Sequence, residues 1–579
     1  MSNYNQFSFL FKKNQGLNHP KIIEFGAILF LGLIALFLNS RMIRDGVNGL
    51  GDLFWHLTWV QHFSQQIAEG ILYPRWIAGT NYGYGSPTFV FYPPLAYYIG
   101  SVFKLIGLDI EQTFSALFTL AIFLSGLNFY IFARSQWDKI PSLVGALAFM
   151  SAPPVARILS FGGLTTAFAT ALIPLGLYLT NQSITKPKWR IALVFFWATL
   201  ALTHLPSLLL YTIIWFIYTL FLFPQHPWKS VLATQVSAGI GFGLVCFYLI
   251  PAILEQSLVN IDYMTDVKGG WYENMLGSSS LPIFPIGEIK DLNYAFVHQS
   301  VNILIGFSLL LIFCLSQAKI IRKALFWFAF IGVIGFLMSR LSAPIWAISS
   351  TLQKVQFPYR LIMIYSFGGA ALFGLTANGL LQKRGWIKIF PLALLIVLLI
   401  LNLKYTYRLS RSLPTTQNPG RGVIPNLEYL QTIINDPFTD KLTDVGEYRP
   451  LLPDGSSPPV PIINQPQVSV ENGEAEVTID DWGSYSRKFT VAAETPSLIR
   501  IRTYHYPAWH LSVNQEERPI DIAEDSTMQF ELEPGSYQIE LQYRQWTKAL
   551  VLGTGLSVAS AVAFIIFSLF NFKTKSPLN

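Results

Sequence analysis

Apolar runs long enough to cross a bilayer recur through most of this chain, and they constrain its fold more than any other feature. A crossing helix needs about 20 predominantly apolar residues. Of the 579 residues, 52% are hydrophobic and 13% are charged, whereas a soluble domain carries about 25% charged residues. We therefore predict a mainly α-helical protein that passes through a membrane many times. The apolar runs lie at about 22–39, 88–107, 113–133, 141–153, 163–180, 189–203, 205–223, 231–254, 299–316, 324–339, 359–380, 387–405 and 549–571.

Lysine and arginine clusters predict the orientation of these runs, because such residues are enriched in the inner loops of membrane proteins. The basic N-terminus and the clusters near 134–139, 186–190, 319–323, 383–388 and 573–575 are placed inside. Residues 40–87, 256–298, 340–358 and 406–548 are then outside. Both flanks of the run 88–107 also fall outside, and its prolines and tyrosines suit an interfacial or re-entrant piece. We expect about 12 crossings plus this embedded piece, with 13 crossings as the alternative.

Residues 406–548 differ in pattern from the rest of the chain. Short alternating runs are separated by the turn pairs Asn472-Gly473 and Pro534-Gly535, which predicts an antiparallel β-sandwich outside the membrane. The predicted organisation is a membrane domain over 1–405, a β domain over 406–548, and a last membrane helix with a short inner tail over 549–579. The expected strands lie near 468–470, 476–479, 498–501, 509–513, 530–532 and 539–541.

The remaining compositional signals restrict the class of protein. Cys246 and Cys314 both fall inside apolar runs, so we expect packing residues and no disulfide framework. The net charge of +7 needs no nucleic-acid partner, since the basic residues lie at the ends of apolar runs. The first run has a basic flank and no small-residue cleavage site after it, and we expect a retained anchor.

Asp52 and His56 are the first candidates for chemistry. Residues 52–69 have the pattern of a surface helix, and these two side chains would share one face at i and i+4. Asp52 could take a proton from an acceptor hydroxyl, with His56 tuning it or binding the acceptor. The alternative is that Asp52, which follows a glycine at the start of a helix, acts only as an N-cap.

Four cations on the outer side suggest an anion site. Arg360 begins a crossing, Lys354 precedes it, Arg340 ends the previous crossing, and Arg75 lies in the first outer loop. A lipid phosphate is a suitable partner, because arginine can bind it with two parallel hydrogen bonds. The alternative is ordinary contact with headgroups.

Four further residues are candidates for binding a substrate: Tyr84 and Tyr92 in the first outer loop, His204 in a tight outer turn, and Trp271, which could stack on a sugar ring. His204 could equally be a hydrogen-bonded turn residue, and most acids of the loop 256–298 are expected to be solvated. We find no phosphate-binding loop, no meaningful Ser-His-Asp spacing and no zinc-ligand spacing.

The first outer loop resembles that of the GT-C-type membrane glycosyltransferases. The resemblance is carried by Gly51-Asp52 to His56, by residues 70–76, by Asn81-Tyr82-Gly83-Tyr84-Gly85-Ser86-Pro87 and by residues 91–95. More narrowly, the chain resembles a bacterial membrane group labelled "6-pyruvoyl-tetrahydropterin synthase-related", although nothing in it is similar to a soluble pterin synthase. Residues 356–361 match a later outer motif of that group, and 504–509 with 534–537 resemble the β domain found before the last crossing in related GT-C proteins.

This resemblance implies a hexosyl- or pentosyltransferase in the inner membrane of a bacterium, with its site on the extracytoplasmic side. It would move a sugar from a polyprenyl-phosphate carrier to a saccharide, lipid or protein acceptor. Asp52 aligns with the family's catalytic acid, and the position of Arg360 suits the carrier phosphate. Several GT-C enzymes hold a metal with acids in the next outer loop, but residues 162–167 contain none. We therefore expect a metal-independent, inverting reaction without a cofactor.

Two other functions remain open from the sequence. A transporter or flippase of lipid-linked saccharides is one, although ionisable residues are nearly absent from mid-span positions, where coupled transporters place them. A non-catalytic assembly protein whose β domain binds a cell-envelope polysaccharide is the other. The sequence does not identify the sugar or the acceptor.

Overall fold

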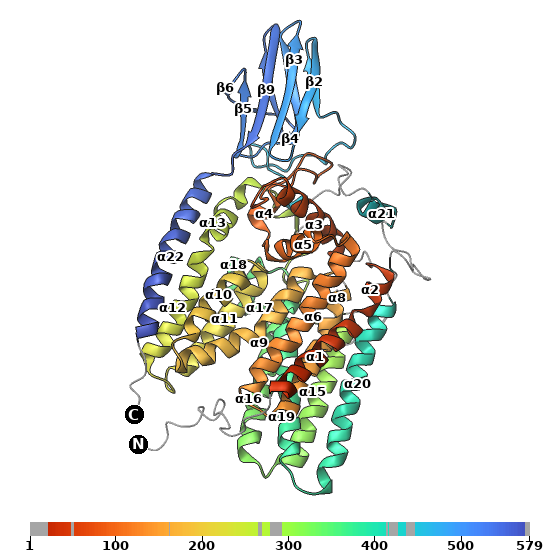
Figure 1. Cartoon of the computed structure of the whole chain (residues 1–579), viewed down its shortest axis with the longest axis vertical. Coiled ribbons are helices and arrows are strands. Elements are labelled where there is room, and N and C mark those ends of the chain that lie inside the picture. Colours follow the sequence, from red (N-terminus) through yellow and green to blue (C-terminus); the bar gives the residue numbers. More distant parts are fainter. Residues whose placement is uncertain are drawn as a thin grey trace.

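Helices and β-sheets occupy opposite ends of the molecule along its long axis (Figure 1). The computed structural model describes residues 21–47, 51–160, 162–264, 269–277, 292–412, 415, 427–435 and 446–573, and the statements below refer to them. The α-helices are α1 (Lys21–Leu38), α2 (Ser40–Asp45), α3 (Leu53–Ala68), α4 (Thr88–Phe91), α5 (Leu95–Leu105), α6 (Ile110–Arg134), α7 (Lys139–Met150), α8 (Pro153–Ser160), α9 (Leu164–Thr185), α10 (Trp189–Ala201), α11 (Leu205–Leu222), α12 (Trp228–Leu244), α13 (Cys246–Leu254), α15 (Leu292–Cys314), α16 (Ala318–Met338), α17 (Ala343–Ala347), α18 (Ser350–Gln353), α19 (Ile362–Leu381), α20 (Ile389–Ser412), α21 (Leu427–Asn435) and α22 (Lys548–Lys573).

Eight of the described helices are long and apolar enough to cross a membrane, and the pair α12 and α13, bent by 70°, would make a ninth crossing. Four shorter apolar helices remain: α1, α5, α7 and α10. Adding α1, α7 and α10 to the nine gives the 12 crossings expected from the sequence. The polytopic, mainly helical fold is confirmed, while the number of crossings stays a prediction.

The run 88–107 is not one helix. Prolines cannot continue a helix without loss of a backbone hydrogen bond, and Pro93-Pro94 separate the four-residue α4 from the 11-residue α5. At 1.5 Å per residue α5 is about 16 Å long, roughly half of the 30 Å hydrocarbon core. The run is thus broken into two short helices, and α5 lies beneath the sheets with α3 and α4 (Figure 1). That the run does not cross stays a prediction.

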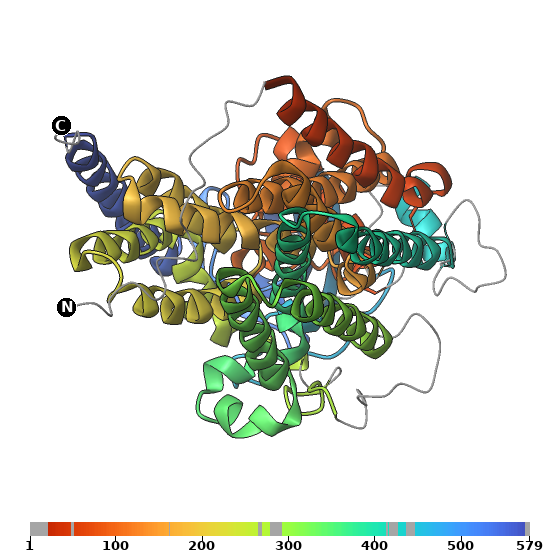
Figure 2. The same ribbon diagram turned by 90° about the horizontal axis from the view of Figure 1, so that it is seen from below.

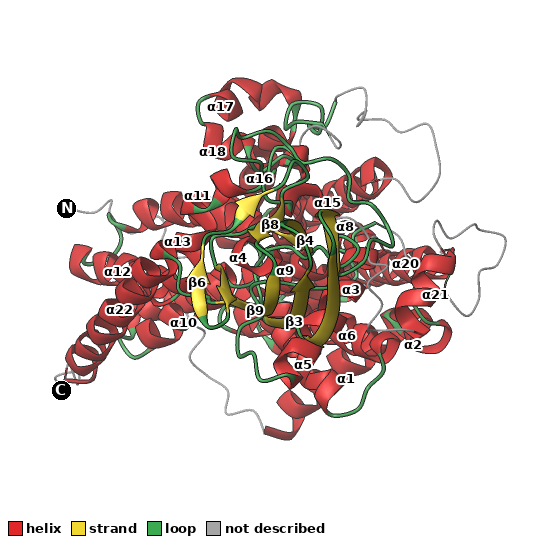
Figure 3. Ribbon diagram, turned by 90° about the horizontal axis from the view of Figure 1, so that it is seen from above, coloured by secondary structure: helices red, strands yellow, loops and turns green. Residues whose placement is uncertain are grey.

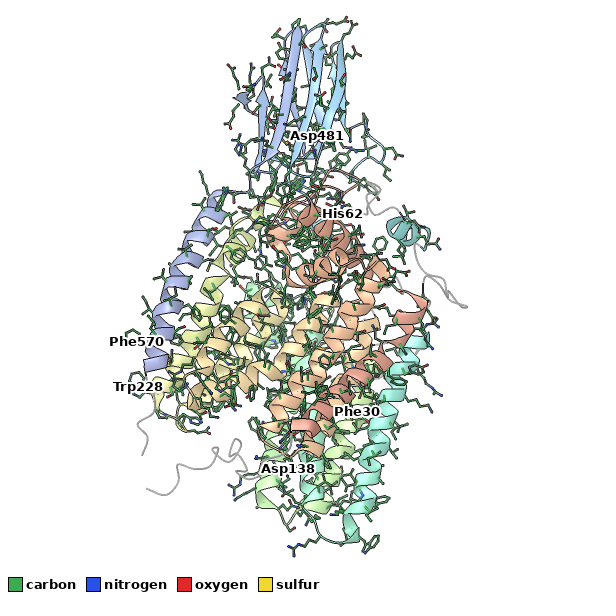
Figure 4. The ribbon with its side chains drawn as sticks, in the orientation of Figure 1. Phe30, His62, Asp138, Trp228, Asp481 and Phe570 are labelled. Carbon is green, nitrogen blue, oxygen red and sulfur yellow. The ribbon has the colours of Figure 1, made fainter. Side chains whose placement is uncertain are left out.

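The two ends of the helical body match the predicted sides of the membrane. Asp138, Trp228 and Phe570, which lie within three residues of Lys139, Lys229 and Lys573, are away from the sheets (Figure 4). His62 of the first outer loop lies beside the sheets, and Asp481 lies within them (Figure 4). Orientation in a real membrane remains a prediction.

Helix α19 forms the centre of the helical body. An 18-residue window of the span Pro358–Leu381 is buried throughout, and α7, α15 and α16 pack against α19. Small residues make this close packing possible: a Cβ added at Gly374 would lie 2.4 Å from the Trp137 ring. Seen from below, α22 lies at the edge of the body beside α12 (Figure 2).

The β domain consists of two antiparallel sheets, in the orders β1-β4-β8-β7 and β2-β3-β9-β5-β6, above the middle of the helical body (Figure 3). All six predicted strands are present. The turn pairs Asn472-Gly473 and Pro534-Gly535 link strands of different sheets and form no hairpins. The strands are β1 (Val468–Asn472), β2 (Ala475–Trp482), β3 (Ser486–Ala493), β4 (Ser497–Tyr504), β5 (Trp509–Val513), β6 (Glu516–Arg518), β7 (Asp521–Ile522), β8 (Thr527–Leu532) and β9 (Gly535–Tyr543).

The β domain shares one hydrophobic core with the first outer loop, so it is held by more than the helices at its two ends. Trp76 packs edge-on against Trp509, with ring centroids 5.6 Å apart. The Tyr485 hydroxyl accepts hydrogen bonds from the backbone nitrogens of Arg75, at 2.7 Å, and Trp76, at 3.1 Å. The sheets therefore support the loop that carries the candidate acid.

Candidate active site

Asp52 stands at the N-cap position of α3, but its side chain makes no capping hydrogen bond. Its backbone carbonyl accepts from the His56 nitrogen at 3.1 Å, while the residue itself is exposed. The absence of a capping bond argues against the alternative that Asp52 serves only as a cap. The expectation that α3 is a surface helix is wrong, because residues on all its faces are buried, and α5, α6 and α21 pack against it.

His56 is buried one turn after Asp52. Its Nδ1 lies 2.6 Å from the Tyr97 hydroxyl of α5, and Trp59 and Tyr92 flank its ring with edge contacts. Burial raises the pKa of Tyr97 well above its ordinary value, so its hydroxyl stays protonated. The imidazole is thus fixed by a neutral partner, as a positioned group in a site requires.

Left-handed backbone shapes the loop between α3 and α4. Asn81 and Tyr82 have φ of 52° and 56°, and Gly83 and Gly85 have φ of 85° and 80°. A Cβ at Gly85 would also lie 2.4 Å from the Trp76 ring. Glycine tolerates both the positive φ and the close approach, so this glycine-rich motif sets the path of the backbone that positions α4 and Tyr92.

Tyr92 interacts electrostatically with both the candidate acid and the candidate cation. Its hydroxyl lies 3.2 Å from the Thr165 hydroxyl at the start of α9. Burial raises the pKa of Tyr92, and the charge of Asp52 raises it further, while the Thr165 hydrogen bond and the charge of Arg360 oppose this. Both charges therefore act at this hydroxyl, which remains protonated.

His204 contributes a neutral imidazole from the turn before α11. Its Nδ1 accepts from the Ser207 backbone nitrogen at 3.3 Å, which places its proton on Nε2. That nitrogen lies 3.4 Å from the Thr166 hydroxyl. Burial lowers the pKa of His204 well below its ordinary value, and the charges of Arg360 and His56 lower it further. This geometry is compatible with both alternatives for His204, a hydrogen-bonded turn residue and a residue of the site.

Arg360 enters the same site from the turn before α19. Its Nη1 donates to the Val355 carbonyl at 2.7 Å, and its guanidinium lies 4.7 Å from the Phe357 ring centroid. Asp52 and Tyr92 interact with its charge. Gln356 holds this turn with φ of 63°, a strained value for a residue with a side chain.

Arg360 also lines a narrow, otherwise largely apolar crevice of about 10 Å³ between α9, α10, α11 and α19. The crevice is lined by Ala169, Ile173, Phe196, Leu200, Ser207, Leu210, Tyr211, Met363 and Ile364. A crevice of this size has room for about one water molecule and not for a hydrocarbon chain.

Five predicted residues thus meet here: Asp52, His56, Tyr92, His204 and Arg360. The structure adds five that the sequence reasoning did not propose for the site. Thr165 and Thr166 lie in the range 162–167, which the sequence marked only for its lack of acids. No local motif marks Tyr97, Glu447 or Tyr448. Electrostatic interactions with Tyr92 place Glu447 nearby, and Phe91 and Tyr448 stack at 5.8 Å. The added residues are Tyr97, Thr165, Thr166, Glu447 and Tyr448.

The other predicted cations make different contacts. Lys354 is exposed and donates to Gln256 at 3.1 Å. Arg340 is exposed over the Tyr272 ring, at 4.7 Å, and Trp271 packs edge-on against the same Tyr272. Arg75 is buried, donating to the Phe247 carbonyl at 2.9 Å.

Tyr84 belongs to the contact with the β domain. Its hydroxyl donates to the Ile462 carbonyl at 3.2 Å, and its ring lies 5.2 Å from that of Tyr504. Glu255, which flanks the loop 256–298, is buried and accepts hydrogen bonds from the hydroxyls of Tyr506 and Thr547. Tyr84 and Glu255 therefore join the helical body to the β domain and the start of α22.

The donor set of the site is poor in metal ligands. Among the described residues, no three His, Cys, Asp or Glu side chains are grouped so that they could hold a metal ion. In the outer loop next to Asp52, the neutral hydroxyls of Thr165 and Thr166 occupy the start of α9. Gly162, with φ of 72°, lets this loop touch α3, since a Cβ there would lie 2.3 Å from Leu53.

Comparison with known proteins gives one family and several solved structures. Residues 89–410, more than half of the chain, match the model of the "6-pyruvoyl-tetrahydropterin synthase related domain; membrane protein". The narrower resemblance noted in the sequence is thereby confirmed. No curated protein matches the sequence.

Two solved structures illustrate the structural similarity. Arabinofuranosyltransferase AftD from Mycobacteria matches with a TM-score of 0.44 and 14% identity over 71% of this chain and 28% of that one. ArnT from Cupriavidus metallidurans bound to undecaprenyl phosphate matches with a TM-score of 0.28 and 14% identity over 72% of this chain and 89% of that one. This chain thus spans about 28% of the length of AftD. Both TM-scores lie below 0.5, so we draw the function from the residues and not from these structures.

Proposed function

The chain belongs to the 6-pyruvoyl-tetrahydropterin synthase related family of membrane proteins, and from that premise we propose that it is a glycosyltransferase. It moves a sugar from a polyprenyl-phosphate carrier to an acceptor at the outer face of a bacterial inner membrane. The transfer inverts the anomeric centre and uses no metal.

One observation carries this proposal: a carboxylate and an arginine from segments about 300 residues apart act on the same tyrosine hydroxyl. Asp52 begins α3 and Arg360 precedes α19, and both charges reach Tyr92. A base and a cation beside one another suit a displacement in which a proton is removed on one side and an anion departs on the other.

In the proposed reaction an acceptor hydroxyl attacks the anomeric carbon of the carrier-bound sugar. Asp52 takes the hydroxyl proton as the new carbon–oxygen bond forms. The bond between the anomeric carbon and the phosphate oxygen breaks, and its electron pair leaves with the polyprenyl phosphate, whose charge Arg360 stabilises. A single displacement from the opposite face inverts the centre.

The neutral groups around Asp52 position the reactants. The N–H at Nε2 of His204 and the Tyr92 hydroxyl can donate to sugar oxygens, since burial keeps His204 neutral and Tyr92 protonated. His56, fixed by Tyr97, borders Asp52 on the same helix. The ring of Tyr92, which is half-buried and packs on Trp59 at 4.7 Å, offers apolar contact to a sugar face.

Metal independence is supported by the chemistry of the donor set. A divalent cation prefers carboxylate and carbonyl oxygens, and the adjacent outer loop supplies Thr165 and Thr166 in their place. The charge of the departing phosphate is then met by Arg360, which can form two parallel hydrogen bonds to it.

The test is a deletion strain whose lipid-linked sugars and cell-envelope glycans are analysed by mass spectrometry. We expect one polyprenyl-phosphate sugar to accumulate while one glycan loses that sugar. The purified enzyme should then transfer it in detergent. A strain with both pools unchanged would refute the proposed transfer. Accumulation without transfer by the purified protein would instead favour a flippase.

A further inference from the structure

A second cationic site lies on the other side of the first outer loop, against the C-terminal helix. A groove of about 960 Å³ runs between α22, the break between α12 and α13, and the foot of the β domain. We call it the α22 groove, defined by Arg75, Phe247, Arg544, Leu550, Thr554 and Ala561. None of these residues belongs to the cluster around Asp52.

The head of the α22 groove is basic. Arg75 is 4% exposed and uses Nη2 on the Phe247 carbonyl, but its buried Nε has no hydrogen-bond partner. Among the described residues no carboxylate forms an ion pair with Arg75. Arg544 and His510 line the same end, and Arg544 pairs with Glu517, which is exposed. A buried guanidinium N–H without a partner is costly, so an anion here would satisfy it.

The rest of the α22 groove is apolar and has the depth of one leaflet. From Leu550 to Ala561 the helix rises about 16 Å, about half of the 30 Å hydrocarbon core. Thr554, Ser557 and Ala561 present small side chains along this stretch. Helix α22 lies at the edge of the body (Figure 2), and only 11% of its membrane window is buried. The groove is therefore open to lipid along its length.

We propose that the α22 groove binds a lipid with a phosphate headgroup, the phosphate at Arg75 and Arg544 and a hydrocarbon chain along α22 in the outer leaflet. The length of the groove, the small residues along it and the unsatisfied Nε at its head all fit this occupant. Two sources share this chemistry: a resident anionic phospholipid, and a second lipid-phosphate substrate.

The test measures lipid retention by the full-length protein, using native mass spectrometry in detergent with added phosphatidylglycerol. Ala561→Phe fills the groove, and Ala559→Phe makes the same change at an exposed position of α22 outside the lining. We expect Ala561→Phe to lose the bound lipid and Ala559→Phe to keep it. Arg75→Gln should weaken retention about tenfold, the loss of one charge-assisted hydrogen bond.

A short-chain polyprenyl phosphate distinguishes the two sources. Displacement of phosphatidylglycerol by it would indicate a lipid-phosphate substrate, and retention would indicate a resident phospholipid; both support the site. Equal retention by Ala561→Phe and Ala559→Phe would overturn the proposal. Because lipid retention is read without any transfer assay, this result is independent of the glycosyltransferase function.

Discussion

Replacement of Arg360 by alanine should weaken donor use while leaving the protein folded. Within the described part of the chain, only Nη1 of this guanidinium donates a hydrogen bond, to the Val355 carbonyl, so its other N–H groups can meet a phosphate. A hydrogen bond to a charged group contributes about 1.5–3 kcal/mol. This corresponds to a loss of about 10- to 150-fold, since 1.4 kcal/mol is a factor of ten.

The assay is a donor titration with purified enzyme and a short-chain polyprenyl-phosphate sugar. Arg360→Lys should recover only part of the loss, because an ammonium cannot form two parallel hydrogen bonds. Arg340→Ala is the matched control, as Arg340 is exposed over Tyr272, and it should change donor use less than twofold by the same reasoning. Unchanged donor dependence in a folded Arg360→Ala protein would refute the phosphate role.

Three further results are expected. EDTA should leave transfer intact; loss of activity that manganese or magnesium restores would contradict the metal-free reaction. In a protein without Cys246 and Cys314, cysteines at the exposed positions Leu72 and Ile106 should both react with an impermeant thiol reagent from outside, whereas labelling of only one would mean that the run between them crosses. Burial lowers the pKa of His62 from 6.5 to about 4, so between these pH values the unfolded state binds more protons than the folded state. The free energy of unfolding should therefore fall by about 3 kcal/mol as the pH drops from 6.5 to 4. A His62→Gln protein whose melting temperature depends on pH as steeply as that of the wild type would show that His62 is not the cause.

Local patterns predicted the parts of this molecule that depend on local physics. The alternating runs predicted β5 and β9, whose buried residues follow the period of two. Strand β3 was missed because it begins Ser486-Arg487-Lys488, which looks like a polar loop. In the structure Arg487 is buried against the Trp482 and Trp509 rings, a stabilisation that no local window contains.

The meeting of the site residues was predictable only in part. Asp52 and Arg360 were each identified from an outer position and an unusual charge, but their proximity depends on how α3 and α19 pack. Glu447 lies far along the chain and reaches the site only because the β domain shares a core with the first loop. Arg75, an outer-side arginine for which the sequence allowed the same two interpretations as for Arg360, lines the α22 groove instead. Its position also depends on packing between distant segments.

Transfer by the Asp52→Asn protein tests the central claim most directly. Asparagine keeps the size and hydrogen-bonding capacity of the side chain but cannot accept the proton, and loss of a positioned base costs about 100- to 10,000-fold in rate. Asp45→Asn is the control, since Asp45 is paired with Arg41 at 2.5 Å and has no place in the reaction. We predict that purified Asp52→Asn is folded, binds donor and transfers sugar at least about 100-fold more slowly than the wild type and Asp45→Asn. Wild-type rates in Asp52→Asn would contradict the account.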